Sequence, residues 1–323
     1  MRLIEGLDAL LGLDLGAIHG EGQGSHSVVA IGVFDGVHLG HQRLLHQLLE
    51  MSSALQGMPT VVTFANHPDQ ILRGQSPPPL VSVPLRLRLL RRAGVARLVL
   101  LQFEPRLQNM TPREFAQRVL VGALRTRGLL LGYDSALGKD RAGTPAVFRE
   151  LGAEFGFEVR TGDPFEVDGQ PISSTAIRNA IAHGDLVLAH RYLGRFPGVI
   201  GTVVRGDGRG RGLGFPTANV ELQPGALPPF GVYAVDAIVD GVVHPAVANL
   251  GVRPTFGGAA GGAGAATATL EVHLLDWTGD LYGRELEVAF RQFLRPEQKF
   301  AGADALRAQI ARDLAAARQA LRA

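Results

Sequence analysis

The sequence contains no cysteine, and only Lys139 and Lys299 are lysines among its 32 basic residues. The absence of cysteine excludes a disulfide scaffold, a cysteine-ligated zinc or iron–sulfur site and a thiol nucleophile. Because lysine is so scarce, any site for phosphate groups must rely on arginine, histidine and backbone N–H groups.

Two common nucleotide-binding motifs are also missing. No GxGxxG motif occurs among the 42 glycines. The nearest match to a P-loop, residues 132–140, has one residue too many between its glycines and an aspartate where serine or threonine is needed. These absences argue against a dinucleotide dehydrogenase and a P-loop kinase.

Charge and hydropathy exclude further classes. The 32 basic and 30 acidic residues leave a net charge of +2, which argues against a nucleic-acid-coating protein. No apolar run approaches the roughly 18 residues of a membrane span. Glu5, Asp8 and Asp14 interrupt the N-terminal apolar stretch, which argues against a signal peptide. We expect a cytoplasmic protein with no nucleic-acid or membrane partner.

The chain is long enough for two domains, since 323 residues exceed the usual size of one hydrophobic core. In the first half, continuous apolar runs predict buried strands, and amphipathic stretches between them predict helices. The expected strands are 28–33, 61–64, 98–103 and 128–131, and the expected helices are 41–55, 84–92 and 112–124. This alternation predicts an α/β domain with a parallel sheet.

The pattern changes near Arg195. From Pro197 onward, short β-type segments alternate with glycine and proline, and a helix follows Pro296 with Leu306 and Ile310 on its apolar face. This predicts a small β-barrel or sandwich with a C-terminal helix. We place the domain boundary between residues 185 and 186.

Polar, glycine-bearing segments follow three of the four expected strands, at the edge where open parallel sheets bind ligands. His38 and His41 begin a helix beside N–H groups that attract anions. Their spacing suits a phosphate site, but it equally suits two histidines that cap or pack a helix end. Ser173, Ser174, Thr175 and Arg178 offer a second anion site or an ordinary helix cap.

The second half contains its own candidate site. The glycines of residues 205–214 would let backbone N–H groups approach phosphates. Thr217 and Asn219 offer oxygen ligands for magnesium, although turn residues would look the same. Glu271 shares one strand face with Thr269 and His273, a pattern that any half-exposed strand also gives.

Several motifs now identify a resemblance. GVFDGVHLGH, ISSTAIR, GFPTAN, ANLGVRPTF, DLYG and RPEQKF stand in the order found in bacterial bifunctional riboflavin kinase/FMN adenylyltransferases, also called FAD synthetases. The chain resembles this family from about Val28 to its C-terminus. The departures are GYDSALG where the family usually has GxDFxFG, with Ser135 and Leu137 at aromatic positions, and FANHP where it usually has FxPHP.

The resemblance implies a Rossmann-like nucleotidyltransferase domain (residues 1–185) and an antiparallel β-barrel riboflavin kinase domain with a terminal helix (residues 186–323). The implied reactions are ATP-dependent phosphorylation of riboflavin to FMN and adenylylation of FMN to FAD. Riboflavin, FMN, FAD and ATP would be substrates or products, and Mg²⁺ would be the cofactor. Two alternatives are a riboflavin kinase with lost or narrowed adenylyltransferase activity, and a flavin-binding protein without turnover.

The resemblance also assigns roles to residues. It implies that His38 and His41 act on phosphates, that Glu271 is the general base of the kinase, and that Thr217 and Asn219 hold the metal. The implied ATP and phosphate contacts are Gly32, Phe34, Asp35, Gly40, Asp134, Ser173, Ser174, Thr175, Arg178, Gly206, Gly208, Arg209, Gly210 and Arg211. The implied flavin contacts are Tyr233, Asn249 and Arg295.

Overall fold

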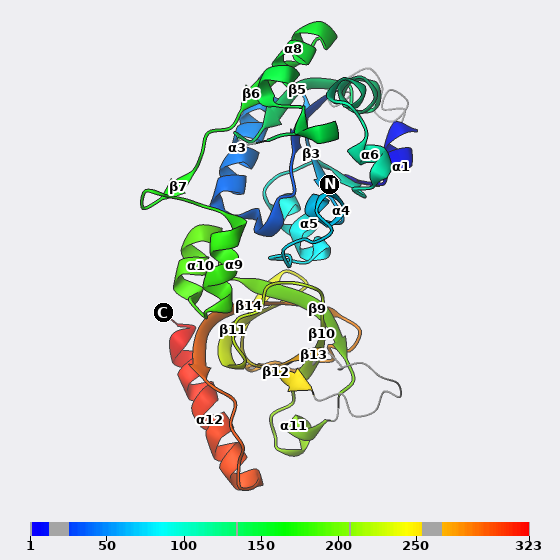
Figure 1. The fold of residues 1–323 in the computed structure, drawn as a ribbon. Coiled ribbons are helices and arrows are strands. Elements are labelled where there is room, and N and C mark those ends of the chain that lie inside the picture. The colour runs from blue at the N-terminus through cyan, green and yellow to red at the C-terminus, as the bar shows by residue number, and fades with distance from the viewer. Residues whose placement is uncertain (1, 13–25, 134, 207, 254–266, 323) are drawn as a thin grey trace. The chain divides into compact units, whose positions relative to one another are not determined.

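The computed structural model describes residues 2–133, 135–206, 208–253 and 267–322, apart from residues 13–25 (Figure 1). The chain divides into two compact units. The first comprises Met1–Pro77 and Arg86–Ile172, and the second comprises Pro78–Leu85 and Ser173–Ala323. The predicted functional boundary between residues 185 and 186 stays a prediction.

The first unit contains a six-stranded parallel sheet in the order β1-β4-β3-β2-β5-β6. Its strands are β1 (Arg2–Glu5), β2 (Ser27–Ile31), β3 (Met58–Phe64), β4 (Arg97–Leu101), β5 (Thr126–Leu131) and β6 (Glu158–Thr161). The four predicted strands are confirmed as the inner four. The outermost strands β1 and β6 were not predicted, because neither contains a continuous apolar run.

Helices accompany the sheet, as the alternating pattern predicts. They are α1 (Leu7–Leu11), α3 (Leu39–Ala54), α4 (Pro68–Leu72), α5 (Val83–Arg92), α6 (Pro105–Gln108), α7 (Pro112–Phe115) and α8 (Pro145–Phe155). The first three residues of α5 are counted with the second unit. Short η1 (Asp35–Val37) and η3 (Lys139–Arg141) turns and the hairpin β7 (Glu166–Val167) and β8 (Gln170–Pro171) complete the unit. The predicted helix 112–124 is α7 continued by the π-helical segment η2 (Ala116–Ala123), and a capping box of Thr111 and Glu114 starts it.

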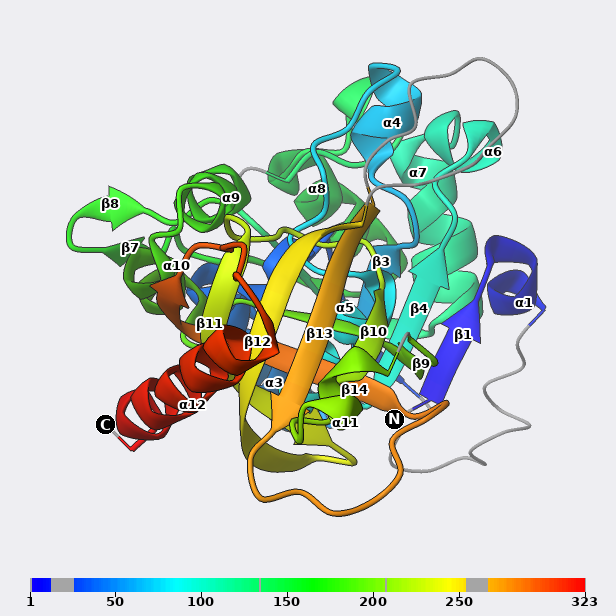
Figure 2. The same ribbon diagram turned by 90° about the horizontal axis from the view of Figure 1, so that it is seen from below.

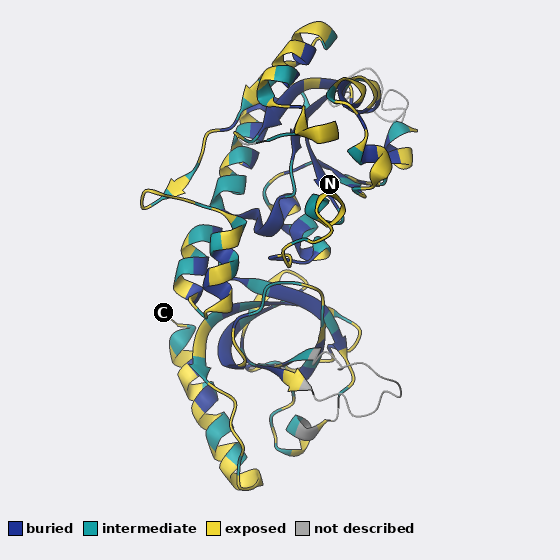
Figure 3. Cartoon of the chain, viewed as in Figure 1, coloured by how far each residue is buried: buried dark blue, intermediate teal, exposed yellow. Residues whose placement is uncertain are grey.

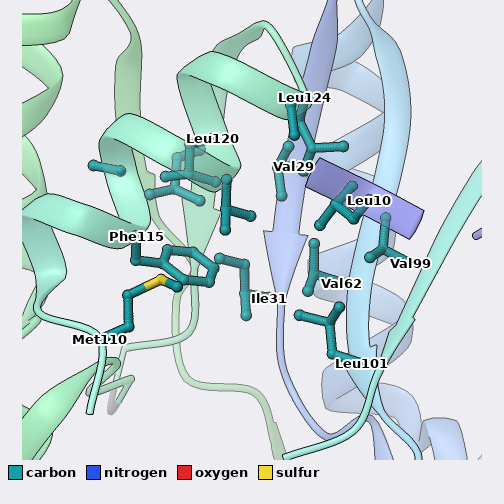
Figure 4. Close-up of a cluster of buried hydrophobic side chains, with 14 of the residues drawn as sticks. Leu10, Val29, Ile31, Val62, Val99, Leu101, Met110, Phe115, Leu120 and Leu124 are labelled. Atoms are coloured by element: carbon teal, nitrogen blue, oxygen red, sulfur yellow. The ribbon is translucent and has the colours of Figure 1, made fainter. Parts of the chain in front are cut away.

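The core of the first unit explains why its inner strands read as continuous apolar runs. All five residues of β2 are buried, and Figure 3 shows the same burial along the neighbouring strands. Val29 and Ile31 pack with Phe115 and Leu120 on one face of the sheet (Figure 4). A strand covered on both faces cannot alternate polar and apolar residues.

The second unit is a closed antiparallel barrel in the order β10-β13-β12-β11-β14-β9, and β9 closes it by pairing with both β10 and β14 (Figure 2). Its strands are β9 (Gly198–Val204), β10 (Ala218–Leu222), β11 (Gly231–Val239), β12 (Val242–Arg253), β13 (Thr267–Leu274) and β14 (Glu285–Arg295). The predicted barrel is therefore confirmed, and the sandwich is not observed.

The helices of the second unit are α9 (Ser174–Ala182), α10 (Leu186–Leu193), α11 (Arg209–Gly212) and α12 (Ala303–Ala320). Asp185 caps α10 by accepting a 2.9 Å hydrogen bond from the Leu188 N–H. On α12, Leu306 and Ile310 are half-buried, while Asp313 and Ala317 are buried. The predicted apolar face thus contains one buried carboxylate, which the Arg295 guanidinium pairs at 2.8 Å.

A prediction follows from the packing of α10. Leu186 belongs to the barrel core, so a fragment that begins at residue 192, near the end of α10, loses a buried leucine, a change that costs about 2 to 5 kcal/mol. We expect residues 173–323 to unfold at a higher temperature than residues 192–323. Calorimetry of the two fragments tests this, and equal midpoints would contradict it.

Candidate active sites

The first candidate site lies in the loop that follows β2. Phe34, Gly36 and Val37 have left-handed backbone angles, with φ of 52°, 74° and 42°. Such angles are strained in phenylalanine and valine, so surrounding contacts must hold them. The Val37 carbonyl accepts a 2.9 Å hydrogen bond from the Gln42 side chain, and the Val33 carbonyl accepts one of 3.0 Å from the Thr63 hydroxyl.

The two predicted histidines meet at the start of α3. The His38 side chain caps the helix by accepting a 3.4 Å hydrogen bond from the His41 N–H. The two rings stack, with centroids 3.7 Å apart and planes 19° apart. His38 therefore caps the helix, as one of the two interpretations of the sequence expected. The His41 side chain does not take part in this cap.

His41 has the features of a binding group. Its Nδ1 atom is buried and has no hydrogen-bond partner among the described residues. Burial, His38 and Arg86 together hold the pKa of His41 well below its usual value, so the ring is neutral at neutral pH. A neutral histidine beside the N–H groups of a helix start can donate a hydrogen bond to a phosphate oxygen.

The other predicted residues of this loop support the histidines. Phe34 and Asp35 are buried, and the Phe34 ring lies 5.2 Å from that of His41. A Cβ at Gly40 would lie 3.2 Å from the His38 ring, and one at Gly32 would lie 3.2 Å from Phe34. The two glycines therefore permit the close packing of this loop.

The motifs that depart from the family have local packing roles. Asn66 donates a 2.9 Å hydrogen bond to the Phe103 carbonyl and accepts one of 2.8 Å from the Phe103 N–H. Leu137 packs against the first core. Asp134, a predicted ATP contact, lies outside the described residues. Asn66 therefore replaces the usual proline with a side chain that links the segments after β3 and β4.

Residues 173–178 of the ISSTAIR motif belong to the second unit. Ser173 caps α9, its hydroxyl accepting a 3.2 Å hydrogen bond from the Ala176 N–H. Arg178 donates a 2.8 Å hydrogen bond to the Pro78 carbonyl, and Thr175 is exposed. The helix cap, one of the two interpretations that the sequence allowed, is thus present at Ser173. The ATP contacts of Ser173, Ser174, Thr175 and Arg178 stay predictions.

The second candidate site is a row of polar side chains across three barrel strands. Glu271 on β13 pairs in register with Asn219 on β10 and with Asn249 on β12. Leu270 and Val272 point into the barrel core, so Glu271 lies on the outer face, as the alternation predicts. In-register neighbours have Cβ atoms about 4.5 to 5.5 Å apart, so the three side chains can share one ligand.

Thr217 extends this row. Its hydroxyl donates a 3.4 Å hydrogen bond to the Glu271 carboxylate. The site therefore combines two amides and an exposed carboxylate on three strands with a hydroxyl directly before β10.

The glycine-rich loop packs against the same residues. A Cβ at Gly206 would lie 2.2 Å from the Asn219 amide nitrogen, and one at Gly210 would lie 3.2 Å from the Thr217 hydroxyl. Gly208 has a left-handed φ of 68°, which glycine adopts without strain. The backbone at Gly206 and at Gly210 thus approaches the polar row closely, whereas the side chains of Arg209 and Arg211 lie outside the described parts.

This close approach gives a prediction. Gly206→Ala would push the Asn219 amide out of place. We expect the FMN formation that the resemblance implies to fall about tenfold or more, because small displacements of positioning groups are costly. Gly212→Ala is the matched control, since a Cβ there meets nothing within 4 Å. Steady-state FMN formation by the two variants tests this, and equal rates would contradict it.

Two of the three predicted flavin contacts have structural tasks. Tyr233 is buried and packs against the rings of Phe290 and Phe293. Its hydroxyl donates a hydrogen bond to the Pro229 carbonyl, and burial raises the pKa of Tyr233 to about 12. Arg295 binds both carboxylate oxygens of Asp313. Only Asn249 lies in the polar row. The flavin contacts of Tyr233 and Arg295 stay predictions.

Sequence reasoning missed Glu297. The Asn249 amide donates a 3.2 Å hydrogen bond to the Glu297 carboxylate. A Cβ at Gly251 would clash with the same carboxylate. The only signal was its place in the RPEQKF motif after β14. Glu297 brings a second carboxylate to the polar row.

The donor set fits magnesium better than a transition metal. The hydroxyl of Thr217 and the amide oxygen of Asn219 are hard oxygen ligands, and magnesium commonly takes one or two protein ligands together with phosphates and water. In the described residues, no group of three or more histidine, cysteine, aspartate or glutamate side chains is placed to hold a metal ion.

Comparisons with known proteins cover both units. The family model for FAD synthetase matches residues 21–176, and the model for riboflavin kinase matches residues 193–321. A bifunctional riboflavin kinase/FMN adenylyltransferase from Pseudomonas fluorescens is 43% identical over 298 residues, which span 90% of this chain and 92% of the relative. One from Escherichia coli K12 is 40% identical over 294 residues, with the same shares covered.

A solved structure matches as well. A crystal structure described as a macrolide-efflux protein from Streptococcus pneumoniae has a TM-score of 0.77 and 31% identity, and the match covers 91% of this chain and 94% of that one. Among the described helices of the present chain, none is long and apolar enough to cross a membrane.

Proposed function

The chain belongs to the family of bifunctional riboflavin kinase/FMN adenylyltransferases, and we propose that the polar row on the barrel and the histidine pair at α3 carry its two reactions. The enzyme phosphorylates riboflavin with ATP to give FMN, and it adenylylates FMN to give FAD. The observation that carries the residue assignment is the register of Asn219, Glu271 and Asn249, with Thr217 bonded to Glu271.

In the kinase reaction, Glu271 acts as the general base. Its carboxylate accepts the proton of the riboflavin 5′-hydroxyl as that oxygen forms a bond to the γ-phosphorus of ATP. The bond between the γ-phosphorus and the bridging oxygen breaks, and ADP leaves with that oxygen. The Thr217 hydroxyl orients the carboxylate. The N–H groups of the glycine-rich loop bind the phosphates, and Asn249 and Glu297 position the flavin substrate.

Magnesium is part of this proposal. Thr217 and Asn219 would hold it, and it would neutralise charge on the ATP phosphates. The fit rests on their oxygen atoms and on the closely packed glycine loop beside them.

In the adenylyltransferase reaction, an FMN phosphate oxygen attacks the α-phosphorus of ATP, and pyrophosphate leaves. His41, with its unpartnered Nδ1, and the adjacent N–H groups of α3 stabilise the charge that develops on the phosphate oxygens. His38 fixes the start of the helix. Ser173, Ser174, Thr175 and Arg178 are proposed to contact ATP.

One assay tests the proposal against its alternatives. The pure protein is incubated with riboflavin, ATP and Mg²⁺, and the flavins are separated by chromatography. We expect FMN and FAD. FMN alone would indicate a kinase with lost adenylyltransferase activity, and neither product would indicate a binding protein.

A further inference from the structure

Arg86 on α5 is a buried cation near the histidine site that the proposed reactions do not use. Only 6% of its surface is exposed, whereas Arg91 on the same helix is exposed. Burying a guanidinium is costly unless hydrogen bonds compensate. Its position therefore needs an explanation beyond the stability of an amphipathic helix.

The contacts of Arg86 are with backbone carbonyls. Nη1 donates a 2.9 Å hydrogen bond to the Val33 carbonyl, and Nη2 donates to the Phe64 carbonyl. Nε is buried and has no hydrogen-bond partner in the described part of the chain. Phe64 is the last residue of β3, and Val33 lies two residues beyond the end of the adjacent strand β2, so one planar guanidinium links the chain at the carboxyl ends of these two strands.

These strand ends determine where the histidines stand. Val33 directly precedes Phe34, the first of the left-handed residues in the loop that leads to His38. Strained backbone persists only where neighbouring groups hold it. Arg86 and Thr63 both donate to the Val33 carbonyl, so they hold the loop at its first residue.

Charge adds a second link. Burial lowers the pKa of Arg86, and the Asp35 carboxylate raises it. Arg86 and His38 both disfavour the protonated form of His41. The guanidinium thus interacts electrostatically with two residues of this loop region: Asp35 raises the pKa of Arg86, and Arg86 lowers the pKa of His41.

We propose that Arg86 is a positioning residue for nucleotidyl transfer, which acts by fixing the Val33 carbonyl and thereby the loop that presents His38 and His41. The inference rests on the proposed role of this histidine pair in FAD formation. A lysine cannot replace Arg86, because one ammonium group lacks the planar fork that reaches two carbonyls at once.

The test uses full-length Arg86→Lys and Arg86→Met proteins supplied with FMN and ATP. We expect kcat for FAD formation to fall about 10- to 100-fold, with KM for FMN and ATP changed less than about threefold, because positioning acts on the transition state. Arg91→Ala is the control on the same helix and should behave as wild type. FMN formation in the same samples should be unchanged.

A second readout follows the histidine directly. In an NMR titration, the pKa of His41 should rise in Arg86→Met, because the variant removes a positive charge that disfavours protonation, while His38 and Asp35 remain. A kcat within twofold of wild type in Arg86→Lys, or an unchanged His41 pKa in Arg86→Met, would overturn the proposal. If wild type itself makes no FAD, the proposed function fails instead.

A third variant keeps the test decisive if the Arg86 variants do not fold. Thr63→Val removes the other donor to the Val33 carbonyl and keeps the shape and charge of the side chain. We expect a fall in kcat for FAD formation of about threefold or more with unchanged KM. Wild-type kcat in this variant, together with unfolded Arg86 variants, would show that Arg86 serves stability alone.

Discussion

Replacing Glu271 with glutamine should lower FMN formation by about 100- to 10000-fold, because the amide keeps the shape of the side chain but cannot accept the proton. Binding of ATP and riboflavin should change little, since Asn219, Asn249 and the glycine loop remain. Single-turnover FMN formation and flavin affinity, measured on the same sample, test both parts.

The control for Glu271 lies on a neighbouring strand. Glu221 on β10 is also exposed on the barrel but pairs in register with Thr202 of β9, outside the polar row. Glu221→Gln should therefore leave the rate unchanged. If Glu271→Gln also turns over normally, Glu271 is only a solvated strand residue and has no place in the mechanism.

Replacing His41 with alanine should lower FAD formation from FMN and ATP by about 100- to 1000-fold, the usual effect of removing one donor that stabilises a developing oxyanion. FMN formation should stay near normal, because the proposed kinase residues lie in the second unit. The fold should also tolerate the change, since the cap of α3 comes from the His38 side chain. Separate assays of the two reactions on one preparation test this.

His46 provides the matched control for His41. It lies on the same helix, is exposed and pairs with Glu50 at 3.2 Å, so His46→Ala should retain both activities. An equal loss of FMN and FAD formation in His41→Ala would contradict the assignment and indicate a folding defect or a shared site.

Local patterns in the sequence predicted the parts of the structure that local forces decide. The inner strands were predictable because burial on both faces requires a continuous apolar run, and the exposed face of Glu271 was predictable because strand residues alternate. The neighbouring positions of His38 and His41 followed from helical spacing. In each case, the information lies within a few residues.

Contacts between distant residues were not predictable in this way. Arg86 and Val33 are 53 positions apart, and Asn249 and Glu297 are 48 apart, so no periodicity links them. Nor does a motif show which groups of the protein itself a side chain contacts. Tyr233 and Arg295 both match the family pattern, yet the structure shows one in the barrel core and the other bound to Asp313.

The closed ring of barrel strands has a consequence for how kinase activity can change during evolution. Asn219, Glu271 and Asn249 stand on three adjacent strands, and in a ring no strand can slide without disturbing the next. A slip of β13 by one residue would turn Glu271 inward and expose Leu270. For the proposed base Glu271, a change of strand register is therefore all or none, whereas the loops around the polar row can change without moving the strands.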